Sequence, residues 1–146
     1  WHWPSPDTVT GANGHSILYA PGEFNNFEFS ALVRTHNRVN SGVFFRGYPD
    51  AARTRGFEVQ IYSPVEAVYP TGSIYGDVRA SLFEDLEDRW FLLQVRLEGA
   101  RCRVWIDGRE VAASYTVPEG KGRIGLQIHH ENSSVDFRDL RVRILE

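Results

Sequence analysis

Residues 56–62 read GFEVQIY, and this stretch alternates apolar and polar side chains with a period of two. Phe57, Val59 and Ile61 occupy one set of positions, while Glu58 and Gln60 occupy the other. Because successive side chains of an extended chain point to opposite faces, this pattern is typical of a strand with one buried and one polar face. The sequence therefore predicts a sheet whose outer face presents Glu58 and Gln60.

Three further stretches repeat this alternation: GVFFR at 42–46, GLQIH at 125–129 and VDFR at 135–138. Together with the first strand, they present as polar positions Arg46, Glu58, Gln60, Gln127, His129 and Arg138. Side chains of these types can form hydrogen bonds and carry charges of both signs, which is typical of a binding or catalytic face. A solvated sheet face on which these residues occur by chance fits the pattern equally well. The sequence does not reveal whether the strands are neighbours.

The remaining strand signals indicate an all-β protein. Short runs rich in Val, Ile, Phe and Leu predict strands at Glu28–Thr35, Ser41–Arg46, Gly56–Tyr62, Trp90–Leu97, Arg101–Ile106, Arg123–His129 and Val135–Leu145. The pair Asp107-Gly108 predicts a tight hairpin turn after the fifth of these strands. Only the stretch 77–88 has helical spacing of apolar residues, so a single helix is expected there. Short strands separated by turns predict one antiparallel β-sandwich domain over residues 1–146.

Composition excludes several classes of function. Sixteen Lys and Arg against nineteen Asp and Glu give a net charge of −3, so nucleic acid is not an expected partner. No apolar stretch approaches the roughly 18 residues that a membrane-spanning helix needs. Cys102 is the only cysteine, so an internal disulfide is ruled out. We expect Cys102 to be a small core residue. The chain begins at Trp1 and contains no Met, so we expect a processed or excised piece of a longer precursor.

Conventional glycoside hydrolysis is weakly supported by the residues themselves. That reaction needs two carboxyl groups, one on each side of the scissile bond. Glu58 is the only strand carboxylate that clearly shares a predicted polar face with other polar side chains. Asp136 alternates with Arg138, but it belongs to a different strand. The five histidines form neither an HxH nor an HExxH motif, so they predict no metal site.

Five motifs resemble one known family. They are NSGVFFR at 40–46, GFEVQI at 56–61, TGSIYG at 71–76, GLQIH at 125–129 and VDFRDL at 135–140. In this order, over about residues 24–145, they are similar to motifs of the 3-keto-disaccharide hydrolase family. The resemblance implies a concanavalin-like jelly-roll sandwich with a carbohydrate site on its concave face. It also implies an exported bacterial protein, secreted or periplasmic, that acts on glycosides already oxidised at C3.

The family's activity fits the polar face described above. A ketone at C3 acidifies the proton on C2, so the glycosidic bond can break by elimination, followed by addition of water. This route needs one base, one acid for the leaving oxygen and donors for the developing enolate. The family pattern often has an Asp five residues after the motif Glu, where this chain has Ser63.

The favoured hypothesis is therefore an enzyme that cleaves 3-keto-glycosides. Glu58 and His129 form the expected proton-transfer pair, with the order of acid and base left open. The expected substrate-binding residues are Arg46, Gln60, Tyr75, Gln127 and Arg138. Of these, the arginines would hold the oxyanion or sugar hydroxyls, and the others would orient the ring. We expect no cofactor and leave a divalent cation open.

Two other hypotheses use the same sandwich. In the first, the protein is a carbohydrate-binding module without catalysis, in which Trp1, Trp3 and Tyr48 stack on sugar rings. In the second, it is a structural or assembly subunit, with its oligomeric state left open.

Overall fold

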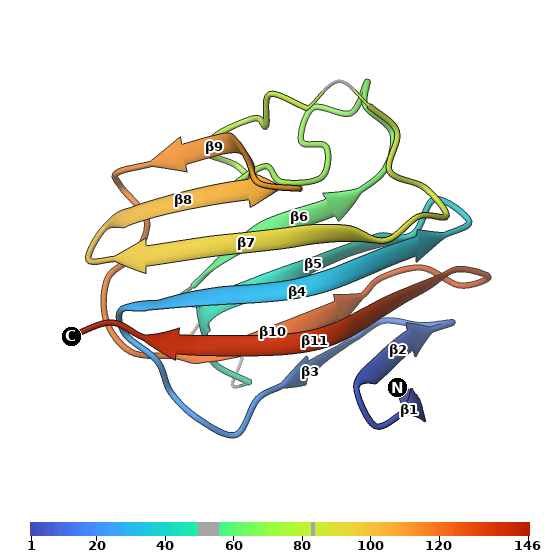
Figure 1. Ribbon diagram of the computed structural model, residues 1–146, viewed down its shortest axis with the longest axis horizontal. Helices are drawn as coiled ribbons and strands as arrows, with labels where there is room; N and C mark the ends of the chain where they lie inside the picture. Colours follow the sequence, from blue (N-terminus) through green and yellow to red (C-terminus); the bar gives the residue numbers. More distant parts are fainter. Residues whose placement is uncertain (50–55, 83) are drawn as a thin grey trace.

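The computed structural model describes residues 1–49, 56–82 and 84–146, and in these ranges it contains strands and no helix (Figure 1). The strands are β1 (His2–Ser5), β2 (Thr8–Ala12), β3 (Ser16–Tyr19), β4 (Phe27–His36), β5 (Asn40–Gly47), β6 (Phe57–Tyr62), β7 (Phe91–Glu98), β8 (Arg101–Ile106), β9 (Arg109–Ser114), β10 (Arg123–Ile128) and β11 (Ser134–Ile144). All seven expected strands are present, with ends that differ by at most one residue. The expected all-β, antiparallel sandwich is confirmed.

Two antiparallel sheets form the sandwich (Figure 1). The larger has seven strands in the order β1-β2-β11-β4-β7-β8-β9, and the smaller has four in the order β3-β10-β5-β6. The expected polar positions are divided between them, because β5, β6 and β10 belong to the small sheet and β11 belongs to the large one. This division decides which of the expected site residues can act together.

The core lies between the sheets and is rich in aromatic rings. Along β4 every second residue is buried, which gives this central strand one buried face that is apolar except for Thr35. The Phe45 ring of the small sheet lies 5.7 Å from Phe27 and 5.4 Å from Phe29 of the large sheet, measured between ring centroids. The ring centroids of Phe57 and Phe45, both in the small sheet, lie 5.9 Å apart. Cys102 is fully buried on β8, as expected for a core residue.

The β8–β9 connection is the tight hairpin that Asp107-Gly108 predicts. Ile106 pairs with Arg109, and the two residues between them have φ angles of +49° and +79°. Positive φ at both central positions defines the turn type that favours an Asp-Gly pair, because it matches the twist of the flanking strands.

The expectation of a helix at 77–88 is wrong for the residues that the structure describes there. Ile74 and Val78 instead exchange two backbone hydrogen bonds of 2.9 Å, which forms a tight turn. The apolar residues after it enter the core one at a time, with Ala80, Leu82 and Leu86 all buried. The apolar residues whose spacing resembles one face of a helix are therefore buried in the core without forming a helix.

The N-terminal strands complete the large sheet and fix Trp1. Its ring lies over Gly11, where a Cβ would come within 2.8 Å of it, and its centroid lies 6.5 Å from that of Phe137. Its indole Nε1 donates a hydrogen bond to Ser16 Oγ at 2.8 Å. Trp1 is thus part of the packing, whereas Trp3 is 62% exposed. No helix in the described part of the chain could cross a membrane.

Candidate functional site

The outer face of the small sheet brings together three of the expected site residues. Backbone register places Gln127 of β10 and Gln60 of β6 on either side of Gly42 in β5. One step along the same face, Glu58 lies opposite Phe44. These positions share a face because they alternate with buried Val43, Val59 and Leu126. The alternation that predicted a polar face on β6 and β10 is therefore present in the structure.

The Glu58 side chain lies flat across the sheet, over Gly42. A Cβ on residue 42 would overlap the Glu58 carboxyl group, so only glycine leaves room for this side chain. Burial raises the pKa of the Glu58 carboxyl group to about 7. A carboxyl group that is half ionised near neutral pH can accept and return protons, and groups perturbed in this way cluster at functional sites.

Gln60 is the polar neighbour of this carboxyl group. In the orientation that satisfies both ends of its amide, the Gln60 nitrogen donates to Glu58 Oε1 at 3.3 Å and to the Ser41 carbonyl at 3.0 Å. The Ser41 hydroxyl in turn donates to the Gln127 carbonyl at 2.5 Å. These hydrogen bonds connect β10, β5 and β6 and fix the side chain beside Glu58.

Tyr75 enters from a segment that extends the small sheet beyond β6. Its backbone N–H donates to the Glu58 carbonyl at 2.9 Å, and the Gln60 N–H donates to the Ser73 carbonyl at 2.9 Å. The Tyr75 ring is 55% exposed, and its centroid lies 5.2 Å from that of Tyr69. Tyr75 is therefore an accessible aromatic residue beside the strand that carries Glu58.

His129 lies at a different level of the sheet. It follows β10, and its backbone N–H donates to the carbonyl of Asn40 on β5. Glu58 pairs with Phe44, which lies four residues further along β5 than Asn40. Four residues along a strand and two strands across the sheet separate the Cα atoms of Glu58 and His129 by roughly 16 Å. The Glu58 carboxyl group itself lies over Gly42, which is two residues along and one strand across from His129, so roughly 8 Å separates it from the His129 Cα atom. The expectation that both residues act on one substrate stays a prediction.

A cluster of histidines surrounds His129. Its ring centroid lies 4.3 Å from that of His15 and 5.6 Å from that of His130. Burial, followed by the charges of these two rings, lowers the pKa of His129. Its Nδ1 is buried without a hydrogen-bond partner in the described residues. The neutral imidazole is therefore the favoured form.

The expectation that Arg46 lies on the same face as Glu58 is wrong. A bulge in β5 puts Arg46 at a φ of +54° and shifts the pairing with β10, so its side chain turns into the sandwich. Its guanidinium donates to the carbonyls of Asn25, Gly99 and Pro118 at 2.6–2.9 Å and is almost completely buried. Period-two alternation fails at a bulge, which an isolated strand sequence does not mark.

The expectation that Arg138 joins the same site is also wrong. Arg138 lies on β11 of the seven-stranded sheet, where its guanidinium carbon is 4.0 Å from the centroid of the Trp90 ring. Arg34 contacts the same ring at 4.6 Å. Asp136, beside them, accepts hydrogen bonds from Thr10 and Arg34. These groups therefore form a structural cluster on the sheet opposite the one that carries Glu58.

Gly42 is the residue of the site that the sequence interpretation missed. A glycine inside a predicted strand often marks the close approach of another group, and Gly42 follows Asn40-Ser41 in one of the motifs quoted above. Ser63 has a structural role, since it is buried and its hydroxyl donates to Glu87. Among the residues with described positions, no three or more His, Cys, Asp or Glu side chains are placed to hold a metal ion.

Comparisons with known proteins agree with this fold. A family model described as a 3-keto-alpha-glucoside-1,2-lyase-like domain matches residues 5–143. Two crystal structures from Parabacteroides distasonis, both named "putative glycosyl hydrolase", are similar to this chain. One has a TM-score of 0.79 and 22% identity, covering 97% of this chain and 88% of its own. The other has a TM-score of 0.83 and 14% identity, covering 95% and 81%.

A third similar structure is the carbohydrate-binding module CBM66 from Bacillus subtilis. Its TM-score is 0.64 at 16% identity, over 91% of this chain and 84% of its own. At these identities the structural likeness establishes the fold. A comparison with curated proteins found no match.

Proposed function

Since this chain belongs to the 3-keto-alpha-glucoside-1,2-lyase-like family, we propose that it cleaves glycosides whose sugar carries a ketone at C3, with Glu58 as the base. Family membership supports a carbohydrate-active role. The finer assignment depends on one observation, which is the buried Glu58 carboxyl group over Gly42, with its pKa raised to about 7.

The chemistry begins with proton transfer from C2. The Glu58 carboxylate takes the C2 proton, and the electron pair of that C–H bond moves toward the C3 ketone to form an enolate. The enolate then expels the C1 oxygen, so the glycosidic bond breaks, a C1–C2 double bond forms, and the departing oxygen takes a proton. Addition of water across the double bond, with hydroxyl at C1 and hydrogen at C2, gives the free 3-keto sugar. Oxidation states balance without a redox partner.

The neighbouring amides suit the other requirements of this reaction. Gln60 is held beside the Glu58 carboxyl group, and its two amide hydrogens, donated to Glu58 Oε1 and to the Ser41 carbonyl, orient this base. Gln127 lies across Gly42 from Gln60, where it can bind a sugar hydroxyl. Tyr75 offers an exposed ring beside the same strand. Arg46 and Arg138 have no part in this proposal, since one is buried and the other lies on the opposite sheet.

Incubation with 3-keto-trehalose tests the proposal, with release of free 3-keto-glucose as the readout. We expect the wild-type protein to release it, and Glu58→Gln to lose about 10²–10⁴-fold in rate. Glu23→Gln, a matched change of an exposed carboxylate between β3 and β4, should keep the wild-type rate. Binding of 3-keto-trehalose without product would instead identify a carbohydrate-binding module, and the proposed activity would be wrong.

A further inference from the structure

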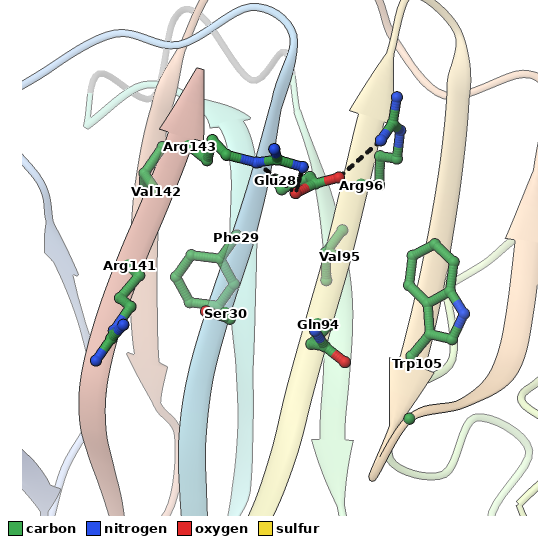
Figure 2. A pocket seen from close by; sticks show the side chains of 11 residues that line it. Glu28, Phe29, Ser30, Gln94, Val95, Arg96, Trp105, Arg141, Val142 and Arg143 are labelled. Carbon is green, nitrogen blue, oxygen red and sulfur yellow. Dashed lines mark hydrogen bonds and ion pairs between the residues drawn. The ribbon is translucent and has the colours of Figure 1, made fainter. Parts of the chain in front are cut away.

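The outer face of the seven-stranded sheet carries a polar groove of about 580 Å³ (Figure 2). Its volume lies within the roughly 300–1,000 Å³ of small-molecule sites. The groove crosses β11, β4, β7 and β8, on the sheet opposite the one that carries Glu58. The chemistry proposed for Glu58 does not use it.

One row of side chains runs across the floor of this groove. The register of the sheet pairs Arg141 with Ser30, Ser30 with Gln94, and Gln94 with Trp105, and Figure 2 shows these four side chains in line. Since strands lie about 4.8 Å apart, the row spans roughly 14 Å between its end Cα atoms. Its members offer a guanidinium, a hydroxyl, an amide and an indole in sequence.

The polar groups of this row are free to bind a ligand. The side chains of Ser30, Gln94 and Arg141 make no hydrogen bond or ion pair with the part of the chain that the structure describes. The guanidinium carbon of Arg103 lies 4.8 Å from the centroid of the Trp105 ring. Trp105 also lines the groove. A row of unused donors and acceptors that ends in an aromatic ring is suited to a polyhydroxylated ligand with an apolar ring face.

The adjacent row explains why one positive charge in the groove is unbalanced. Glu28 accepts hydrogen bonds from Arg96 at 2.7 Å and from Arg143 at 2.5 Å, and Arg96 also binds Glu98 at 2.8 Å. The two ion pairs of Glu28 form one wall of the groove (Figure 2). Arg141 has no such partner, so it is the cation that remains available for a carboxylate.

We propose that this groove binds an acidic oligosaccharide, with a carboxylate at Arg141 and a sugar ring against Trp105. Ser30 and Gln94 between them bind hydroxyl groups. The separation of Arg141 and Trp105 across four strands requires a ligand of more than one sugar unit, because no single ring spans it. The groove therefore provides a second carbohydrate site, distinct from the face that carries Glu58.

Isothermal titration calorimetry with trigalacturonate tests this site. We expect saturable binding that weakens as salt is raised, because the key contact is between exposed charges. Arg141→Gln and Trp105→Ala should each weaken binding at least ten-fold, with Gln94→Ala as a third variant should Trp105→Ala fail to fold. Arg123→Gln, which removes an arginine of the small sheet, and Glu58→Gln should both bind as wild type does.

Five outcomes would overturn the proposal. Absence of saturable binding would remove the site, and so would wild-type affinity in the folded Arg141→Gln protein. Equal affinity for neutral maltotriose, or competition by inorganic phosphate with Trp105→Ala unaffected, would show that a carboxylated sugar is not what the groove recognises. Loss of binding in Glu58→Gln, with wild-type binding in Arg141→Gln, would place the ligand on the small sheet instead.

Discussion

The carboxyl group of Glu58 occupies the space that a side chain at Gly42 would fill. The backbone of Gly42 is extended and lies inside β5, so its lack of a side chain serves this close approach and not a turn. Across the same glycine lie Gln60 and Gln127. Gly42 thus determines both where the proposed base lies and how far it is removed from water.

Gly42→Ala tests this relationship. The added methyl group should push the Glu58 carboxyl group toward solvent, which lowers its pKa toward the ordinary value of 4.5. We expect a lower rate of 3-keto-glycoside cleavage, and a rate profile whose rise with pH moves below the wild-type midpoint of about 7. Gly14→Ala is the matched control, because a Cβ there meets nothing within 4 Å. An unchanged midpoint in Gly42→Ala would contradict the control of the Glu58 pKa by this packing.

The same carboxyl group should make stability depend on pH. Its folded-state pKa of about 7 exceeds the ordinary 4.5, so the folded protein binds this proton more tightly than the unfolded chain does. The resulting stability is present below about pH 4.5 and is lost as pH rises through 7, a change of about 3 kcal/mol. The free energy of unfolding of Glu58→Gln, measured with urea, should lack this decline. The stability of the variant relative to wild type should therefore increase from acid to alkaline pH. A constant difference between the two proteins would mean that Glu58 ionises normally.

His129 should matter less to turnover than Glu58. The lowered pKa of His129 favours the neutral imidazole, which is a poor acid for the departing oxygen, and Glu58 already supplies the base. We expect His129→Ala to keep the rate within about ten-fold of wild type, below the loss typical for a proton-transfer group. Steady-state rates on 3-keto-trehalose decide this point. A loss in His129→Ala equal to that in Glu58→Gln would restore the pair expected from the sequence.

Arg46 should contribute to stability. Its buried guanidinium satisfies three backbone carbonyls in loops between strands, and removal of the side chain leaves all three without donors. We expect Arg46→Ala to lower the free energy of unfolding by roughly 3 kcal/mol or more. Arg123→Ala, at a partly exposed position on the neighbouring strand, serves as the control. Denaturant titration measures both, and a loss below about 1 kcal/mol would leave Arg46 without the structural role assigned here.

Alternation within strands was sufficient to predict the faces of β6 and β10, because nothing interrupts their period of two. The same reasoning failed at Arg46, where a bulge inserts one residue, and at Arg138, where the face is polar but belongs to the other sheet. Sheet membership depends on long-range pairing that a single sequence does not encode locally. The space over Gly42 was missed for a related reason, since it exists only once β5 and β6 are adjacent.

Cleavage of 3-keto-trehalose in deuterium oxide tests the role of Glu58 most directly. Elimination followed by addition of water places a solvent hydrogen on C2, so we expect NMR to show deuterium at C2 of the earliest 3-keto-glucose. Free 3-keto-glucose incubated with Glu58→Gln corrects for exchange that does not depend on the reaction. We further expect Glu58→Gln to release almost no product. Product that retains its original C2 hydrogen, or rapid cleavage by Glu58→Gln, would contradict proton abstraction by this carboxylate.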